Sequence, residues 1–219
     1  MLIGALSAVA LGCNPPPPRT SRAASPTEAT AASPPGAEPT LSREEAVARA
    51  EEFPPDPTLK GEALPIDGSD LVRGRATVMV DAPIDKVRAT LLDFEKYPEF
   101  MPEFSRSRIL NRLPDGGKQV YQEMSILGGT IRIWANVKIP QAKNDDGVET
   151  HATEFVEGNV KDYQATWRLR AVDESHTELT AELYLIPKLF VPTSWINGKN
   201  VEGAAKAVQA MKRRVETTP

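Results

Sequence analysis

The chain has 219 residues, of which 40% are hydrophobic and 26% are charged, and its formal net charge is −4. This composition is typical of an ordinary globular protein, and a mildly acidic chain with no run of Lys and Arg argues against a nucleic-acid partner. The single cysteine excludes an internal disulfide.

The first twelve residues are uncharged, mostly apolar and end on small side chains, as expected just before a signal-peptide cleavage point. They are too few to cross a bilayer as a helix. Cys13 follows, and then four prolines at 15–18 hold the chain extended, which argues against burial of this thiol in a helix or central strand. Cys13 is therefore a reactive thiol or a site of modification.

The stretch Leu11-Gly12-Cys13 resembles a bacterial lipobox, in which the signal peptide is removed and the cysteine carries a diacylglycerol. The resemblance implies a signal peptide at 1–12, lipidation of Cys13 and export to the cell envelope. Asn14 after the cysteine implies the periplasmic face of the outer membrane. We therefore predict a protein that is anchored to a membrane without spanning it. The alternative is an N-terminal segment with no such role.

Residues 14–40 are mainly Pro, Ala, Ser, Thr and Glu, with almost no large apolar side chain. Such a segment cannot bury enough surface to offset the entropy lost on ordering, so we predict a disordered tether that reaches at most about 80 Å. For 41–68 we expect a short helix at 41–53, with Ser42 as its cap, followed by an irregular lead-in.

The folded domain is expected over 69–216, where strand and helix periodicities begin. Alternating residues at 75–80 predict a strand, and an apolar stripe after Pro83 predicts a helix. Further alternating runs are separated by short turns, which favours antiparallel hairpins. With a short strand at 105–110, the sequence predicts about seven strands.

Four of the alternating runs have a clear apolar face, whereas the inward face of 148–158 is ambiguous. These faces consist of Val120, Met124 and Ile126; Ile131, Ile133, Ala135, Val137 and Ile139; Tyr163, Ala165, Trp167 and Leu169; and Leu179, Ala181, Leu183 and Leu185. A closing helix carries a stripe of smaller residues, namely Val201, Ala204, Ala205, Val208, Met211 and Val215. Because this stripe has little bulk, large strand residues or a bound molecule must fill the space beneath it.

The order of these elements, with the stretch "VMVDAPIDKVRATLLDFEKYPEFMPEFSRSRIL", resembles START-like proteins of the SRPBCC superfamily, close to the polyketide cyclase and coenzyme-Q-binding branch. The matching positions are Ala82-Pro83-Ile84, Val87, Asp93-Phe94, Tyr97-Pro98-Glu99-Phe100 and Pro102. The resemblance covers roughly 70–216. It implies an α+β, helix-grip fold, in which a curved antiparallel sheet of about seven strands wraps around a long C-terminal helix with an apolar cavity between them.

We expect this cavity to bind a hydrophobic small molecule. The residues predicted to line it are Phe100, Met124, Ile133, Val137, Trp167, Leu183, Val201, Ala205 and Val208. The residues predicted at its rim are Tyr97, Met101, Phe190 and Trp195. These rim loops either dip into a membrane interface, where Trp and Tyr are favoured, or close the open end of the sheet.

The sequence contains no catalytic motif that we can identify, and neither His151 nor His176 has the neighbours of a metal site. We therefore predict no catalytic residue, no metal and no cofactor, and we interpret Ser194 as a helix cap. Four polar strand residues would reach the cavity only if a strand had the opposite register: Arg132, Tyr121, Glu154 and Tyr184.

Three functions remain open at this point. The first is a membrane-anchored carrier that binds a lipid, sterol or quinone. The second is an enzyme of the cyclase or dehydratase kind. A buried cluster such as His151 with a carboxylate would favour this function. The third is a protein-interaction module whose pocket is filled by its own side chains. The sequence does not indicate the oligomeric state.

Overall fold

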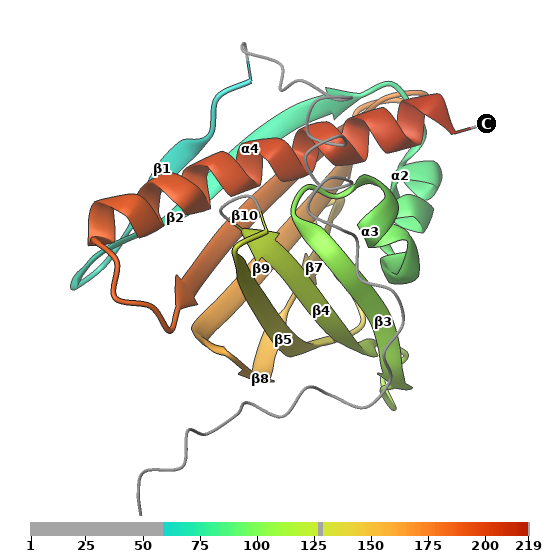
Figure 1. The fold of residues 1–219 in the computed structure, drawn as a ribbon. Coiled ribbons are helices and arrows are strands. Elements are labelled where there is room, and N and C mark those ends of the chain that lie inside the picture. The colour runs from blue at the N-terminus through green and yellow to red at the C-terminus, as the bar shows by residue number, and fades with distance from the viewer. Residues whose placement is uncertain (1–58, 127–128, 219) are drawn as a thin grey trace, which may run out of the picture. The chain divides into compact units, whose positions relative to one another are not determined.

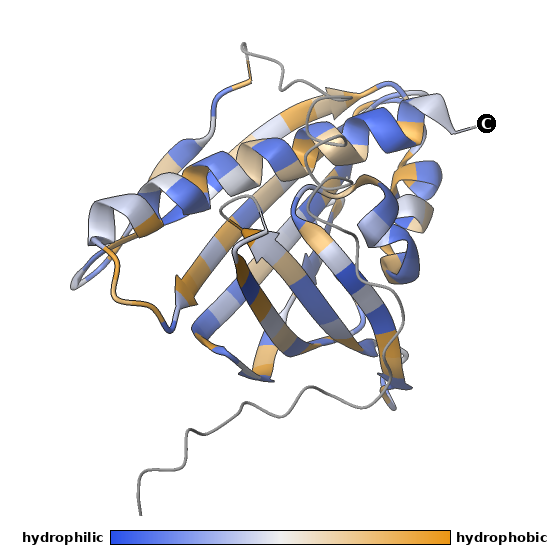
Figure 2. Cartoon of the chain, viewed as in Figure 1, coloured by the Kyte–Doolittle hydropathy of each residue, from blue (hydrophilic) through white to orange (hydrophobic). Residues whose placement is uncertain are grey.

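The structure is a computed structural model that describes residues 59–126 and 129–218. The expected signal peptide, Cys13, the tether and the helix at 41–53 lie outside the described residues. Two antiparallel sheets and a long C-terminal helix form the domain (Figure 1). This confirms the predicted α+β architecture, and the strands carry alternating hydrophobic and hydrophilic residues as expected (Figure 2).

The larger sheet has six strands, all paired antiparallel. In spatial order they are β1 (Glu62–Ile66), β2 (Ser69–Val80), β10 (Thr177–Pro187), β9 (Val160–Ala171), β7 (Val148–Ala152) and β6 (Lys143–Asp145). The irregular lead-in predicted up to residue 68 is wrong for β1. Pro65 obscured this strand in the sequence, and it is tolerated there because β1 lies at the edge of the sheet.

The smaller sheet has four strands in the order β3 (Phe104–Arg112), β4 (Lys118–Ile126), β5 (Ile131–Ile139) and β8 (Glu154–Gly158). The ambiguous run at 148–158 is not one strand, because the chain changes sheets at Thr153, with β7 pairing with β9 and β8 with β5. This change of sheet, together with the short β1 and β6, gives ten strands in two sheets within the described residues, where about seven in one sheet were expected.

Two short helices and a 3₁₀ turn connect β2 to β3: α2 (Ile84–Leu91), η1 (Phe94–Lys96) and α3 (Tyr97–Phe100). The last helix, α4 (Thr193–Thr217), begins earlier than its apolar stripe suggested. Pro192, not Ser194, is its N-cap, and no side chain caps this end. None of the helices in the described part of the chain has the length and hydrophobicity that a bilayer crossing requires.

Helix α4 crosses β2 and β10 at close range (Figure 1). The β2–β10 ladder ends at the pair Leu183 and Gly74, and asparagines of α4 then take over as backbone partners. The Val72 N–H donates to Asn197 Oδ1 at 3.0 Å, and Asn200 Nδ2 donates to the Val72 carbonyl at 3.0 Å. Asn200 Oδ1 also accepts from the Leu185 N–H at 3.1 Å. The helix is thus fixed in position over the sheet by hydrogen bonds as well as by packing.

Candidate functional site

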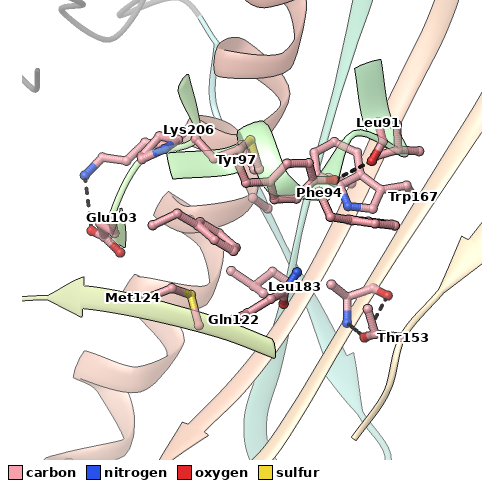
Figure 3. A pocket seen from close by; sticks show the side chains of 18 of the residues that line it. Leu91, Phe94, Tyr97, Glu103, Gln122, Met124, Thr153, Trp167, Leu183 and Lys206 are labelled. Carbon is pink, nitrogen blue, oxygen red and sulfur yellow. Dashed lines mark hydrogen bonds and ion pairs between the residues drawn. The ribbon is translucent and has the colours of Figure 1, made fainter. Parts of the chain in front are cut away.

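A cavity of about 90 Å³ lies between the two sheets and α4 (Figure 3). Its walls come from β4, β5, β7, β9 and β10, from the stretch between the end of α2 and the start of β3, and from one face of α4. Most of the lining side chains are apolar, among them Leu91, Phe94, Met101, Phe104, Met124, Trp167 and Leu183. A second cavity of about 70 Å³ adjoins it and shares Met124, Leu183 and three other lining residues with it.

Aromatic packing holds one wall of the first cavity. The Tyr97 ring lies 5.4 Å from both Phe94 and Phe104, measured between ring centroids. Its hydroxyl donates to the Leu91 carbonyl at 2.7 Å, so this buried polar atom is satisfied within the protein. Burial raises the pKa of Tyr97 well above its usual value. This tyrosine is therefore a structural part of the wall.

Charged groups occupy the more exposed side of the cavity. Glu103 and Lys206 line both cavities, and their side chains are 37% and 33% exposed. Lys206 Nζ lies 3.9 Å from Glu103 Oε1 and 2.6 Å from Glu202 Oε1. Burial raises the pKa of Glu103, although Lys206 opposes this. Glu103 also has a φ of 65°, which is rare for a residue with a side chain. We call this pair the ionic mouth.

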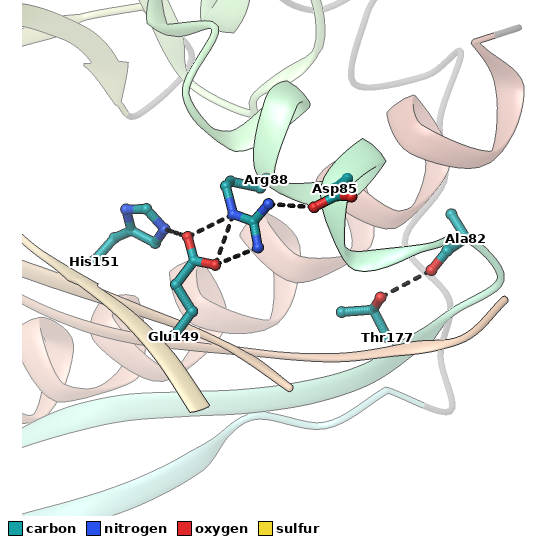
Figure 4. A network of polar contacts seen from close by, with 6 residues as sticks. All are labelled: Ala82, Asp85, Arg88, Glu149, His151 and Thr177. Atoms are coloured by element: carbon teal, nitrogen blue, oxygen red, sulfur yellow. Dashed lines mark hydrogen bonds and ion pairs between the residues drawn. The ribbon is translucent and has the colours of Figure 1, made fainter. Parts of the chain in front are cut away.

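An ion-pair network centred on the buried Glu149 lies behind another part of the wall (Figure 4). His151 lines the cavity, and its Nε2 is 2.6 Å from Glu149 Oε1. Arg88 of α2 reaches both oxygens of Glu149, at 2.8 and 2.6 Å from its Nε, and also pairs with Asp85. Burial acts to raise the pKa of Glu149, but hydrogen bonds from Arg88 and His151 outweigh it and lower the pKa. A histidine beside an ionised carboxylate on a cavity wall is an arrangement that can transfer protons.

The structure brings some of the predicted site residues together at the cavities. Met124, Trp167, Leu183, Tyr97 and Met101 line the first cavity. Ile133 and Trp195 line the second.

The other predicted residues are not among those that line either cavity. Val137 and Val208 are fully buried in the core, and Ala205 is buried there too. Val201 approaches Gly61, and Phe100 packs on Tyr97 and beneath Arg214. On α4, the first cavity is lined by Gly203, Ala204, Lys206 and Ala207. Most of these residues are neighbours of the predicted apolar stripe and not members of it. An apolar stripe indicates which face of a helix is buried. It does not indicate which residues of that face pack against a strand and which line a cavity.

The predicted rim residue Phe190 is fully exposed and lines neither cavity. Arg132, Tyr121, Glu154 and Tyr184 also line neither cavity. The expectation that all four face solvent is wrong for Tyr121, which is 2% exposed because it packs against Trp134 and Arg108. Sequence reasoning missed Glu103, Lys206 and Gln122 as lining residues. For Gln122 a signal was present, because it alternates with Val120 and Met124 along β4.

Within the described residues, no group of histidine, cysteine and carboxylate side chains could hold a metal ion.

The comparisons with known proteins agree on the fold. A family model described as "Polyketide cyclase / dehydrase and lipid transport" matches residues 80–211. No curated protein matches the chain. A START superfamily protein from Mycobacterium smegmatis is 23% identical with a TM-score of 0.58, and the match covers 66% of this chain and 97% of that one.

Two further solved structures are similar. A STAR-related lipid transfer protein from Xanthomonas axonopodis is 18% identical with a TM-score of 0.63, over 74% of this chain and 96% of that one. The Zhui aromatase/cyclase from a Streptomyces species is 16% identical with a TM-score of 0.53, over 66% of this chain and 93% of that one. At these identities the likeness establishes a START-like helix-grip fold.

Proposed function

This chain belongs to the polyketide cyclase / dehydrase and lipid transport family, and on that premise we propose that it binds a hydrophobic small molecule, such as a lipid, sterol or quinone, between its sheets and α4. The observation that carries this proposal is the largely apolar cavity beneath a helix of small residues. Each methylene buried in such a cavity contributes about 0.8 kcal/mol. Tight binding of an apolar molecule therefore needs no charged group.

We further propose that the chain is exported, lipidated at Cys13 and held at the periplasmic face of the outer membrane. The lipobox-like stretch before Cys13 and the polar, proline-rich residues that follow support this. A tethered domain samples a small volume at a high effective concentration, which suits the transfer of a ligand to or from a nearby membrane.

The pairing of His151 with Glu149 at the cavity wall favours a second candidate function. In this candidate the chain is a cyclase-like or dehydratase-like enzyme, and His151 moves a proton to or from a bound polyketide-like substrate. It differs from the carrier in one measurable respect, because the bound molecule would be converted over time. A His151→Gln variant would then retain the ligand and lose the conversion.

The test of the binding function is native mass spectrometry of the full-length chain after gentle purification, with organic extraction of any bound molecule. We expect a noncovalent adduct that leaves on collisional activation, whereas acyl chains on Cys13 remain attached. An Ala165→Phe variant places a ring in the cavity and should lose the adduct. Thr166→Phe on the opposite face of β9 is the matched control and should retain it.

The carrier proposal would be contradicted by a mass that shows no adduct and that does not change after incubation with vesicles of membrane lipids. It would shift support to the enzyme or to an interaction module with a self-filled pocket.

A further inference from the structure

Gln122 brings a carboxamide into the largely apolar wall of the first cavity. Its side chain comes from β4, where it lies between the core residues Val120 and Met124, and only 2% of the residue is exposed (Figure 3). No described residue provides a hydrogen-bond partner for its Oε1. A buried polar atom without a partner costs free energy, and of the four such side-chain atoms in the described residues only Gln122 Oε1 belongs to a residue that lines this cavity.

Tyr163 brings a second polar group from the other sheet. It lies on β9, lines the same cavity and is 4% exposed. The described residues form no hydrogen bond with its hydroxyl, and burial alone raises its pKa above the usual value, so the hydroxyl is neutral. Tyr97 on the same cavity differs, because its hydroxyl already donates to the Leu91 carbonyl. Thr153 differs likewise, because its hydroxyl bonds with the Ala165 backbone.

The charged groups of the cavity lie elsewhere. Glu103 and Lys206 form the more exposed ionic mouth, whereas Gln122 and Tyr163 are almost completely buried. The side chain of Glu182, another lining residue, pairs with Arg75 and Arg168. His151 is already paired with Glu149. An ionised ligand group at Gln122 and Tyr163 would find no free opposite charge among these residues, which makes its burial unfavourable.

We propose that Gln122 and Tyr163 form a polar subsite that binds a neutral oxygen atom, a carbonyl or hydroxyl, of an otherwise apolar ligand. The carboxamide and the phenol each donate and accept hydrogen bonds, so together they suit either group. This inference rests on the proposed binding function and narrows its ligand class. The subsite favours neutral oxygenated molecules over hydrocarbons. It also favours them over molecules that would bury a carboxylate or phosphate beside Gln122 and Tyr163.

The test compares three probes of nearly the same shape by isothermal titration calorimetry of the full chain after removal of bound lipid: 2-naphthol, naphthalene and 2-naphthoate. We expect 2-naphthol to bind about tenfold or more tightly than naphthalene, because the hydrocarbon leaves both polar groups unpaired. We expect 2-naphthoate to bind more weakly than 2-naphthol because its charge lacks a partner.

Two variants assign the preference to the subsite. Tyr163→Phe and Gln122→Leu should each reduce the preference for 2-naphthol over naphthalene by about threefold or more, and leave naphthalene affinity within about twofold. Tyr97→Phe is the matched control, since it removes a cavity-wall hydroxyl that is already bonded, and it should leave the preference unchanged. The melting temperature provides an independent readout. It should fall for Tyr97→Phe but not for Tyr163→Phe, whose hydroxyl has no bond to lose.

Equal binding of 2-naphthol and naphthalene, or an unchanged preference in both subsite variants, would overturn the subsite and leave the proposed binding function intact. Tightest binding of 2-naphthoate would also overturn it. Binding of none of the three probes would count against the binding function itself, and the subsite would fail with it.

Discussion

At the scale of single residues, two of the buried carboxylates, Glu149 and Glu182, are each accompanied by arginine. Glu149 lies between Arg88 and His151, and Glu182 between Arg75 and Arg168, with both glutamate side chains 8% exposed. A charge removed from water is unfavourable unless hydrogen bonds and an opposite charge replace the lost solvation. Glu149 therefore has a structural role in joining α2 to β7, whatever His151 does at the cavity.

Glu149→Gln tests this role. We expect the variant to lose about 1–3 kcal/mol of unfolding free energy at pH 7, because Arg88 loses its charged partner. The folded pKa of Glu149 lies below its ordinary value of 4.5, so the stabilisation is present above that pH and is lost as pH falls through the folded pKa. The difference between wild type and variant should shrink accordingly in urea titrations carried out from pH 7 downwards.

Glu178→Gln is the control, because its pair with Arg170 is more exposed and should contribute at most about 1 kcal/mol. An equal loss in the two variants, or a loss for Glu149→Gln that does not vary with pH, would contradict the role assigned to the buried pair.

At the scale of elements, the approach of α4 to β2 depends on a glycine. A Cβ atom added at Gly74 would lie 1.9 Å from the Asn200 carbonyl oxygen, well inside any real contact. Glycine is unfavourable within a strand for reasons of entropy, so its presence there is explained by this close backbone approach. The same contact brings Asn200 within reach of the Val72 and Leu185 backbones, and so determines how α4 lies over the cavity.

Gly74→Ala should therefore destabilise the domain by about 1–3 kcal/mol or more, because helix and strand must move apart. Gly198→Ala is the matched control within α4, where an added Cβ meets nothing within 4 Å. It should stabilise the domain by about 0.5–1 kcal/mol through helix propensity. Thermal unfolding measures both changes. A Gly74→Ala variant as stable as wild type would show that the close contact is not required.

At the scale of the whole molecule, the cavity, the long polar segment before the domain and Cys13 combine in the proposed carrier. The domain supplies a largely apolar site, and the acyl chains on Cys13 would supply the attachment. One acyl chain gives only marginal membrane binding, and two or more give stable attachment. The proposed attachment would thus depend on a single thiol that is separated in sequence from the domain.

Cys13→Ser should consequently move the chain from the membrane fraction to the soluble fraction. The intact mass of the wild type should correspond to a chain that begins at Cys13 and carries acyl groups. Ser21→Ala, in the segment that follows, is the control and should remain with the membrane. Membrane association that is equal in the Cys13→Ser variant and the wild type would rule out the lipid anchor.

The sequence by itself determined the order of the main helices and strands, the antiparallel pairing and the apolar faces of four strands, but not β1, β6 or the division of 148–158 into β7 and β8. These properties are local, because side chains alternate along a strand and recur every three to four residues along a helix. The family resemblance rested on the order of these elements together with the residues of 78–110, and it implied the apolar cavity. Met124, Trp167 and Leu183 were predicted at that cavity from their positions on apolar faces, and they line it.

Only the tertiary structure decided which part of each buried face meets the cavity and which part meets another element. Val208 and Gly203 lie on the same helix, yet Val208 is in the packed core and Gly203 is at the cavity. The change of sheet at Thr153 and the pairing of Arg88 with Glu149, 61 residues apart, were likewise invisible in the sequence. Periodicity reports the direction of a side chain relative to its own backbone, whereas its neighbours depend on how distant segments cross in space.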